Sequence, residues 1–246
     1  MSELRIGCSG FNYSHWRGTF YPQDLPQRRW LQHYCTVFSS VELNVTFYRL
    51  PLPATFDKWY RETPEDFVFS LKGSRFVTHV KRLIDPEGPV ERFFDAASRM
   101  KEKLQVVLWQ FPPKFMLNAE RLRRFLLLLR DYPVRNTLEF RHESWISREV
   151  IDLCREYDVG LCMADWPGFN DDLPVTADFV YVRRHGKTGG YDTCYSRADL
   201  KKDAGRIKSY LKAGKDVFVY FNNDASGYAP KNAYELMEML KPENGS

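Results

Sequence analysis

Short hydrophobic runs recur eight times along the chain, and nearly all of them end in a polar or charged cluster. Amphipathic segments of helical length separate most of these runs, which cover Leu4–Gly10, Val41–Tyr48, Phe67–Arg75, Val106–Pro113, Thr137–Trp145, Val159–Trp166, Phe179–Gly186 and Val217–Asp224. A strand followed by a helix, repeated eight times, is typical of a closed parallel barrel. The pattern therefore predicts an α/β fold, a single (β/α)8 barrel of the TIM type with parallel inner strands.

The length of 246 residues matches one such barrel, and no Gly/Ser/Pro-rich linker divides it, so we expect one domain over residues 1–246. The five scattered cysteines indicate free thiols in a reducing compartment. The N-terminal residues lack the apolar stretch of a signal peptide, and the longest aliphatic run, Phe125–Leu129, is too short for a bilayer. We expect a soluble, cytoplasmic protein with no membrane partner.

Charge narrows the choice of partner further. The chain carries 36 basic and 32 acidic residues, a net charge of +4. Dedicated nucleic-acid-binding domains are usually far more basic, so nucleic acid is a possible partner but not the favoured one. The sequence leaves the oligomeric state open.

The barrel hypothesis also locates a site, because barrel enzymes place their chemistry at the C-terminal ends of the strands. The polar residues that the pattern puts there are Glu42, Asn44, Lys72, Gln110, Glu139, Arg141, Asp165, Arg183, His185 and Asn222. Alternate residues of a barrel strand face the helices and the interior, and the helix-facing set must be apolar. This rule turns the others inward. It does not decide the direction of Gln110 and Asp165, because their strands are apolar in both registers.

The inward set contains similar numbers of carboxylates and cations. Charges in a semi-enclosed mouth are costly unless they are paired, so we expect an ion-pair network across strands. Such a network either closes the barrel structurally or organises a ligand, and its origin in six or more strands favours a ligand site.

The loop Arg184–Tyr191 combines cations with glycines, and Asn222–Gly227 follows the adjacent strand. Barrels often bind phosphate between these two loops, so we expect an anion site there. Metal binding by Glu139, Asp165 and His185 is the alternative. Because neighbouring cations compete for the same carboxylates, we expect the protein to be metal-free, and we expect no cofactor.

The segment Phe11–Pro22 is rich in aromatic residues with polar tips, among them Tyr13 and Trp16. Such a loop, together with Tyr48, either covers a pocket and stacks on a ligand or packs as a structural cap.

Motifs along nearly the whole chain carry a resemblance to a known family. They include Ile6–Gly10, Trp16–Pro22, Val41–Tyr48, Thr78–His79, Gln110–Pro113, Leu138–His142, Ala164–Asp165, Tyr181–Arg183, His185–Gly186 and Tyr220–Asn223. Through them the chain resembles the YecE-like family, a domain of unknown function. The resemblance implies a TIM-type barrel and no established activity. The family pattern has Trp at the position of Phe11 and Leu at that of Arg184.

The leading hypothesis is an enzyme (a hydrolase, isomerase or lyase) that acts by acid/base chemistry on a small anionic substrate, phosphorylated or sugar-like. Glu139 is the expected general acid or base, with Glu42, Lys72 and Asp165 as further catalytic candidates. The expected ligand-binding residues are Arg141, Arg183, His185, Asn222, Asn44, Gln110, Tyr13, Trp16 and Tyr48. A metal-dependent phosphodiester hydrolase acting on nucleic acid and a non-catalytic ligand-binding or scaffold protein are the alternatives.

Overall fold

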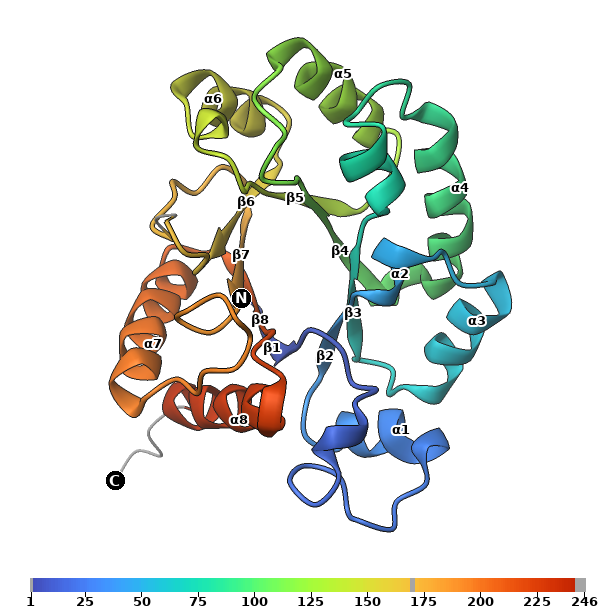
Figure 1. Ribbon diagram of the computed structural model, residues 1–246, viewed down its shortest axis with the longest axis vertical. Coiled ribbons are helices and arrows are strands. Elements are labelled where there is room, and N and C mark those ends of the chain that lie inside the picture. Colours follow the sequence, from blue (N-terminus) through green and yellow to red (C-terminus); the bar gives the residue numbers. More distant parts are fainter. Residues whose placement is uncertain (1, 169–170, 242–246) are drawn as a thin grey trace.

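A computed structural model describes residues 2–168 and 171–241. Eight parallel strands, each paired with the next, close into a barrel when β1 pairs with β8 (Figure 1). The strands are β1 (Leu4–Cys8), β2 (Ser40–Leu43), β3 (Val68–Lys72), β4 (Leu104–Gln110), β5 (Arg135–Glu139), β6 (Gly160–Ala164), β7 (Phe179–Arg184) and β8 (Asp216–Phe221). The predicted α/β barrel is confirmed.

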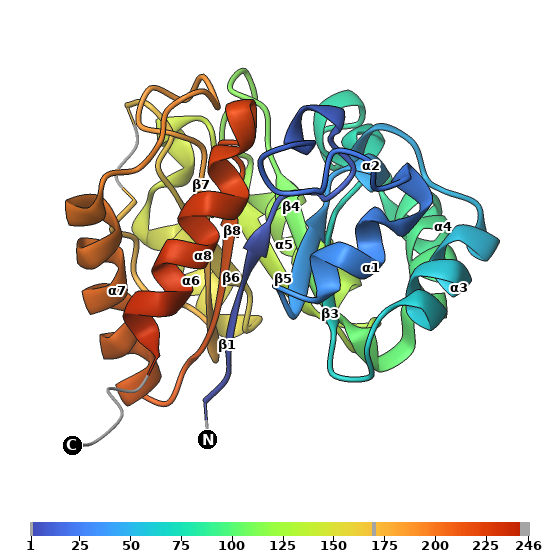
Figure 2. The same cartoon turned by 90° about the horizontal axis from the view of Figure 1, so that it is seen from below.

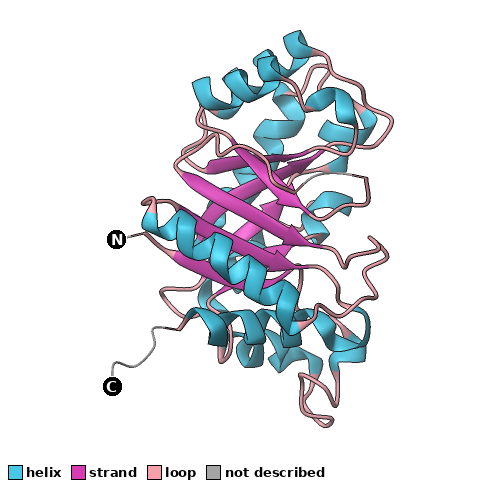
Figure 3. Cartoon of the chain, turned by 90° about the vertical axis from the view of Figure 1, so that its left-hand side faces the viewer, coloured by secondary structure: helices cyan, strands magenta, loops and turns pink. Residues whose placement is uncertain are grey.

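Helices surround the strands on the outside of the barrel (Figures 1 and 3). They are α1 (Trp30–Cys35), α2 (Val45–Tyr48), α3 (Pro53–Glu62), α4 (Glu87–Ala97), α5 (Ala119–Leu129), α6 (Arg148–Glu156), α7 (Arg197–Lys212) and α8 (Tyr228–Leu240). Side-chain caps start three of them: Asn118 caps α5, Ser147 caps α6, and Ser196 caps α7 in a capping box with Asp199. Helix α8 lies over β1, where the barrel closes (Figure 2).

Short helical turns fill the loops between these elements. Five are 3-10 turns or runs of them, η1 (Ser14–Trp16), η2 (Gln27–Arg29), η4 (Ser98–Lys103), η5 (Glu143–Trp145) and η6 (Ala225–Gly227), and η3 (Phe76–Val80) is a π-helical turn. No helix within residues 2–168 and 171–241 has the length and apolar character needed to cross a membrane.

The strands end earlier than the hydrophobic runs predicted. The predicted strand Val41–Tyr48 divides into β2 and helix α2, and the end of Thr137–Trp145 contains the 3-10 turn η5. The alternating pattern continues past Leu43, but Thr46 Oγ1 donates to the carbonyl oxygens of Leu43 and Lys72, at 3.0 and 2.7 Å, and stabilises a helical turn. The alternation therefore marks which side chains are buried, and it overestimates strand length.

The inward parity of the strands is confirmed by a second, inner core. Phe179, Tyr181, Phe218 and Tyr220 pack inside the barrel with six smaller residues, Val68, Val106, Leu108, Cys162, Ala164 and Ala177. Val106 and Leu108 face the barrel interior, so Gln110, two residues further along β4, also lies on the inner face. Cys162 and Ala164 face the interior as well, so the next residue, Asp165, points outward.

Candidate functional site

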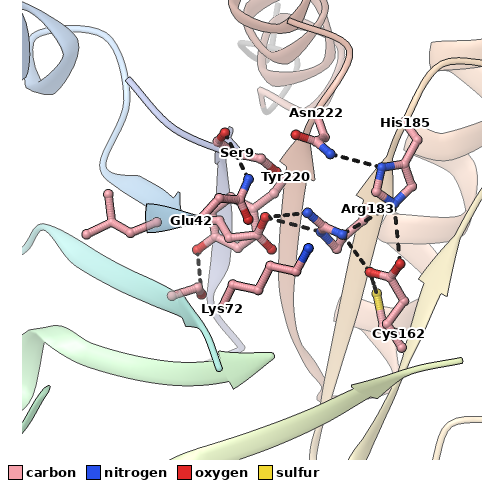
Figure 4. A network of polar contacts seen from close by, with 12 residues as sticks. Ser9, Glu42, Lys72, Cys162, Arg183, His185, Tyr220 and Asn222 are labelled. Carbon is pink, nitrogen blue, oxygen red and sulfur yellow. Dashed lines mark hydrogen bonds and ion pairs between the residues drawn. The ribbon is translucent and has the colours of Figure 1, made fainter. Parts of the chain in front are cut away.

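The predicted ion-pair network lies above the inner core, at the C-terminal ends of the strands. Its centre is Arg183 of β7, which is 1 % exposed. Arg183 donates to Glu42 Oε1 from Nε and Nη2, at 3.1 and 2.8 Å, and to Glu139 Oε2 from Nη1, at 2.6 Å (Figure 4). Tyr181 donates to the other oxygen of Glu42 at 2.7 Å. One arginine thus joins the carboxylates of two strands, and its polar capacity is used within the protein.

Glu139 also forms an ion pair with Arg141 on the loop after β5. Burial acts to raise the pKa of this carboxyl, but the Arg141 and Arg183 guanidinium groups hold the pKa well below its usual range. A carboxylate with so low a pKa is a weak base and is not protonated at neutral pH. The structure therefore favours Glu139 as an anchor for two arginines, and the expected acid/base role needs another group.

His185 is completely buried beside the two arginines. Burial first, and then Arg183, lower the pKa of its imidazole to about 4, so the ring is neutral at pH 7. Its Nε2 lies 3.0 Å from Arg141 Nη2 and 3.4 Å from Arg183 Nη1. Its Nδ1 lies 3.0 Å from Nδ2 of Asn222 (Figure 4). His185 is thus a neutral support for Arg141.

Arg141 is the arginine that retains unused donors. Its guanidinium Cζ lies 3.7 Å from the ring centroid of Trp166, a cation–π contact that holds the group flat. Arg141 is 6 % exposed, and its buried Nε and Nη1 have no hydrogen-bond partner within the described residues. Unsatisfied buried donors are rare in folded proteins and point to a ligand.

Lys72, at the end of β3, is the second free cation of the mouth. Its Nζ lies 4.2 Å from the centroid of the Phe47 ring and makes no hydrogen bond or ion pair within residues 2–168 and 171–241. Burial and the nearby Arg183 lower the pKa of this amine to about 8. Figure 4 shows the amine of Lys72, which comes from the strand next to that of Glu42, pointing toward Arg183.

Asp165 faces away from this group. Its Oδ1 accepts the backbone N–H of His185 at 2.6 Å, and its Oδ2 accepts the hydroxyl of Tyr195. Glu139, Asp165 and His185 therefore do not converge as metal ligands, and the described residues contain no cluster of three or more His, Cys, Asp or Glu able to hold a metal ion. Burial raises the pKa of Asp165, whose role here is to fix the start of the loop after β7.

That loop uses most of its own donors, contrary to the expected phosphate site. The backbone N–H of Gly186 donates to Tyr195 Oη, and that of Gly189 donates to the Gly186 carbonyl, both at 2.7 Å. Lys187 pairs with Asp199 at 2.7 Å. Arg141 and Lys72, in contrast, keep donors without a hydrogen-bond partner within the described residues.

The aromatic loop after β1 packs against the barrel as a structural cap. Trp16 is fully buried, and its Nε1 donates to the Asp224 carbonyl at 3.2 Å, which ties this loop to the one after β8. Tyr13 donates to the Ser9 carbonyl at 2.7 Å. Tyr48, by contrast, is 71 % exposed on α2. Of these three, Tyr48 alone presents an exposed ring.

Two further predicted residues lie at the edge of the network. Asn44 Nδ2 lies 3.3 Å from the Ser9 carbonyl, while Asn44 Oδ1 and Ser9 Oγ are buried without a partner within the described chain. Gln110 is half-buried, and its Nε2 contacts the Phe111 carbonyl at 3.5 Å. Both side chains retain polar capacity on the mouth side of their strands.

Sequence reasoning missed the residues that surround the two free cations. Trp166 and Phe47 contact Arg141 and Lys72, and Tyr191 packs against His185 with 5.5 Å between ring centroids. The position of Trp166 at the end of a hydrophobic run was a usable signal. Phe47 gave no such signal, because the parity rule assigned it to a strand that does not extend that far.

A wide hollow lies at the other end of the barrel. It measures about 720 Å³ and is lined by residues at the N-terminal ends of β4 and β5, among them Leu104, Tyr132 and Arg135. No buried charge without a counter-ion faces it. The unsatisfied charges, and not the size of a hollow, therefore locate the candidate site at the C-terminal mouth.

Comparison with known proteins agrees with this architecture. The family model "Protein of unknown function DUF72" matches residues 5–246. The curated UPF0759 protein YunF of Bacillus subtilis is 29 % identical over 98 % of this chain and 95 % of its own. A solved DUF72 family protein from Thermotoga maritima is 32 % identical, with a TM-score of 0.86 over 98 % of this chain and 100 % of its own.

A more distant structural likeness concerns the fold alone. A D-psicose 3-epimerase, solved in the presence of D-fructose, is 8 % identical, with a TM-score of 0.60 over 98 % of this chain and 100 % of its own. The family match, in contrast, spans almost the whole sequence, the barrel and the charged mouth. The chain belongs to the DUF72 family of proteins of unknown function.

Proposed function

We propose that this protein is an enzyme that acts by acid/base chemistry on a small anionic substrate, phosphorylated or sugar-like, at the C-terminal mouth of the barrel. The observation that carries the proposal is Arg141, whose buried Nε and Nη1 have no hydrogen-bond partner among the residues that the structure describes. These two donors point in different directions from the planar guanidinium, and each can bind one oxygen atom of an anionic ligand.

The charge of the mouth supports an anion. The carboxylates of Glu42 and Glu139 face three cations, Arg141, Arg183 and Lys72, and His185 is neutral at pH 7. One positive charge is therefore left without a counter-ion in a buried site, and an anionic ligand balances it.

Lys72 is the best candidate for proton transfer. Its pKa of about 8 lies close to neutral pH, so both protonation states are accessible there. Glu139 and Glu42 pair with the arginines and hold them in place, and Asp165 positions the backbone of His185. The proposed acid/base residue is therefore Lys72 and not Glu139, which was the first candidate from the sequence.

Thermal unfolding with added anions tests the proposal. Phosphate, sulfate or a sugar phosphate at a hundredfold excess over its dissociation constant should stabilise the protein by about 2.7 kcal/mol. Arg141→Met should abolish this shift, because it removes the free donors and retains much of the side-chain volume. Arg148→Met, at an exposed arginine of α6, is the matched control and should respond like the wild type.

Unchanged melting curves with all three anions would contradict the proposal, as would an Arg141→Met variant that responds like the wild type. Arg183→Ala is a poor probe here. It leaves Glu42 and Glu139 buried without their shared partner, so loss of folding would mask any effect on binding.

A further inference from the structure

The chain buries two lysines in very different surroundings. Lys103 is 5 % exposed, and its Nζ donates to the carbonyl oxygens of Tyr60 and Thr63 and to Thr63 Oγ1, at 2.8, 2.9 and 3.1 Å. Lys72 is 9 % exposed, and its Nζ donates no hydrogen bond within the described residues. Lys103 has a complete structural role, whereas the amine of Lys72 is uncommitted.

The surroundings of Lys72 leave its ammonium form poorly stabilised. Both nearby carboxylates, Glu42 and Glu139, are already paired with Arg183, and Nζ lies over the Phe47 ring. The pKa of about 8 follows from this burial and from the charge of Arg183. A neutral amine has a free electron pair, which makes it a nucleophile as well as a base.

We propose that Lys72 is a nucleophile that forms an imine with the carbonyl carbon of the substrate, which is an aldehyde or ketone that also carries a phosphate or carboxylate group. This inference rests on the proposed function, since Arg141 binds the anionic group while Lys72 attacks the carbonyl. It adds to that function a covalent intermediate and a substrate class.

The step balances without a further reactant. The ammonium of Lys72 releases a proton, Nζ forms a bond to the carbonyl carbon, and the C=O bond becomes a C–OH group that gains the proton. A second proton of the amine then moves to the hydroxyl group, which leaves as water, and the third proton stays on nitrogen, so the product is a protonated imine. Ammonium and carbonyl thus give iminium and water, with one positive charge on each side.

Unpartnered polar atoms beside this position suit the rest of such a substrate. Ser9 Oγ and Asn44 Oδ1 are buried without hydrogen-bond partners in the described chain, and Figure 4 shows Ser9 in the same group as Glu42 and Lys72. A hydroxyl group next to the carbonyl, as in a sugar phosphate, can both donate to Asn44 Oδ1 and accept from Ser9 Oγ.

Reductive trapping of the full-length protein tests the inference. Dihydroxyacetone phosphate and pyruvate serve as anionic carbonyl probes, with sodium cyanoborohydride to reduce any imine at pH 7.5. Intact-mass and peptide mass spectrometry should show one adduct, equal to the probe less one oxygen atom, on Lys72. Labelling there should be roughly a hundredfold faster than at exposed Lys201, because a larger fraction of the amine is neutral.

Three comparisons make the result decisive. Lys103 is the internal control for burial and should stay unlabelled, and Lys72→Arg should lose the adduct while keeping the positive charge. Arg141→Met should slow labelling by dihydroxyacetone phosphate at least tenfold and leave labelling by uncharged dihydroxyacetone nearly unchanged.

The outcomes separate this inference from the proposed function. Anion-dependent stabilisation without an adduct on Lys72, or with labelling no faster than at Lys201, overturns the imine and leaves the anion site intact. Absence of both stabilisation and adduct overturns the two together. The wild-type peptide map decides the matter even if Lys72→Arg does not fold.

Discussion

An ammonium group buried without a counter-ion destabilises a folded protein, because the group loses its hydration and receives too little in return. Lys72 is in this position: its charge faces the Phe47 ring and the like charge of Arg183. Groups retained at such a cost are often functional, since activity and stability make different demands on a site. Lys72 therefore links the energetics of the barrel mouth to its chemistry.

Lys72→Met should stabilise the protein at pH 7 by up to about 3 kcal/mol, because one pKa unit corresponds to 1.36 kcal/mol. The folded pKa of about 8 lies below the value of 10.5 for a free lysine, so between these pH values the unfolded chain binds more protons. Wild-type stability should then rise from pH 8 to pH 10.5, relative to the variant. Urea unfolding at pH 7 and pH 9.5 measures both effects, and a Lys72→Met protein less stable than the wild type at pH 7 would refute the argument.

At the scale of elements, Arg184 joins strand β7 to helix α7. Its position on the strand points it outward, away from the mouth, and it is 4 % exposed. Nε and Nη2 donate to the two carboxylate oxygens of Asp203 at 2.7 and 2.5 Å, and Nη1 pairs with Asp171 at 3.1 Å. The resemblance to the YecE-like family implies Leu at this position, so we expect that apolar packing can replace the ion pair.

Arg184→Leu alone should destabilise the protein by about 3–5 kcal/mol, because it leaves Asp203 buried without its partner. Combining it with Asp203→Leu should recover most of that loss, since two apolar side chains then fill the same space. The four proteins form a double-mutant cycle measured by urea unfolding. If the double variant is as unstable as the sum of the single ones, the ion pair does not account for the cost.

At the scale of the whole molecule, barrel closure assembles the site from distant parts of the chain. Glu42 and Arg183 are 141 positions apart, yet two nitrogen atoms of Arg183 donate to one carboxylate oxygen of Glu42. The same closure surrounds each carboxylate of the mouth with cationic or hydroxyl donors, which leaves little room for a metal ion.

We therefore expect the purified protein to contain far less than one equivalent of zinc or manganese by elemental analysis. Near-stoichiometric metal that disappears in His185→Ala, but persists in the exposed-histidine control His15→Ala, would contradict this expectation. It would favour the alternative of a metal-dependent hydrolase, with His185 as a ligand.

The sequence by itself determined the barrel and the identity of most charged residues in its mouth. Eight hydrophobic runs recur at the spacing of β-α units, and strand parity follows from the need to bury apolar side chains, so both are local properties of the chain. Parity turned Glu42, Lys72, Glu139, Arg183 and His185 inward correctly.

Only the tertiary structure decided what each of these residues can do. The pairing of Arg183 with two carboxylates, the neutral state of His185 and the free donors of Arg141 depend on distances between strands that no local pattern contains. Asp165, equivocal by parity, was decided by the inward register of Cys162 and Ala164. Local periodicity determines the side of a strand on which a side chain lies. The protonation state of that side chain, and whether its donors are free to bind a ligand, depend on its three-dimensional environment, which forms only when the barrel closes.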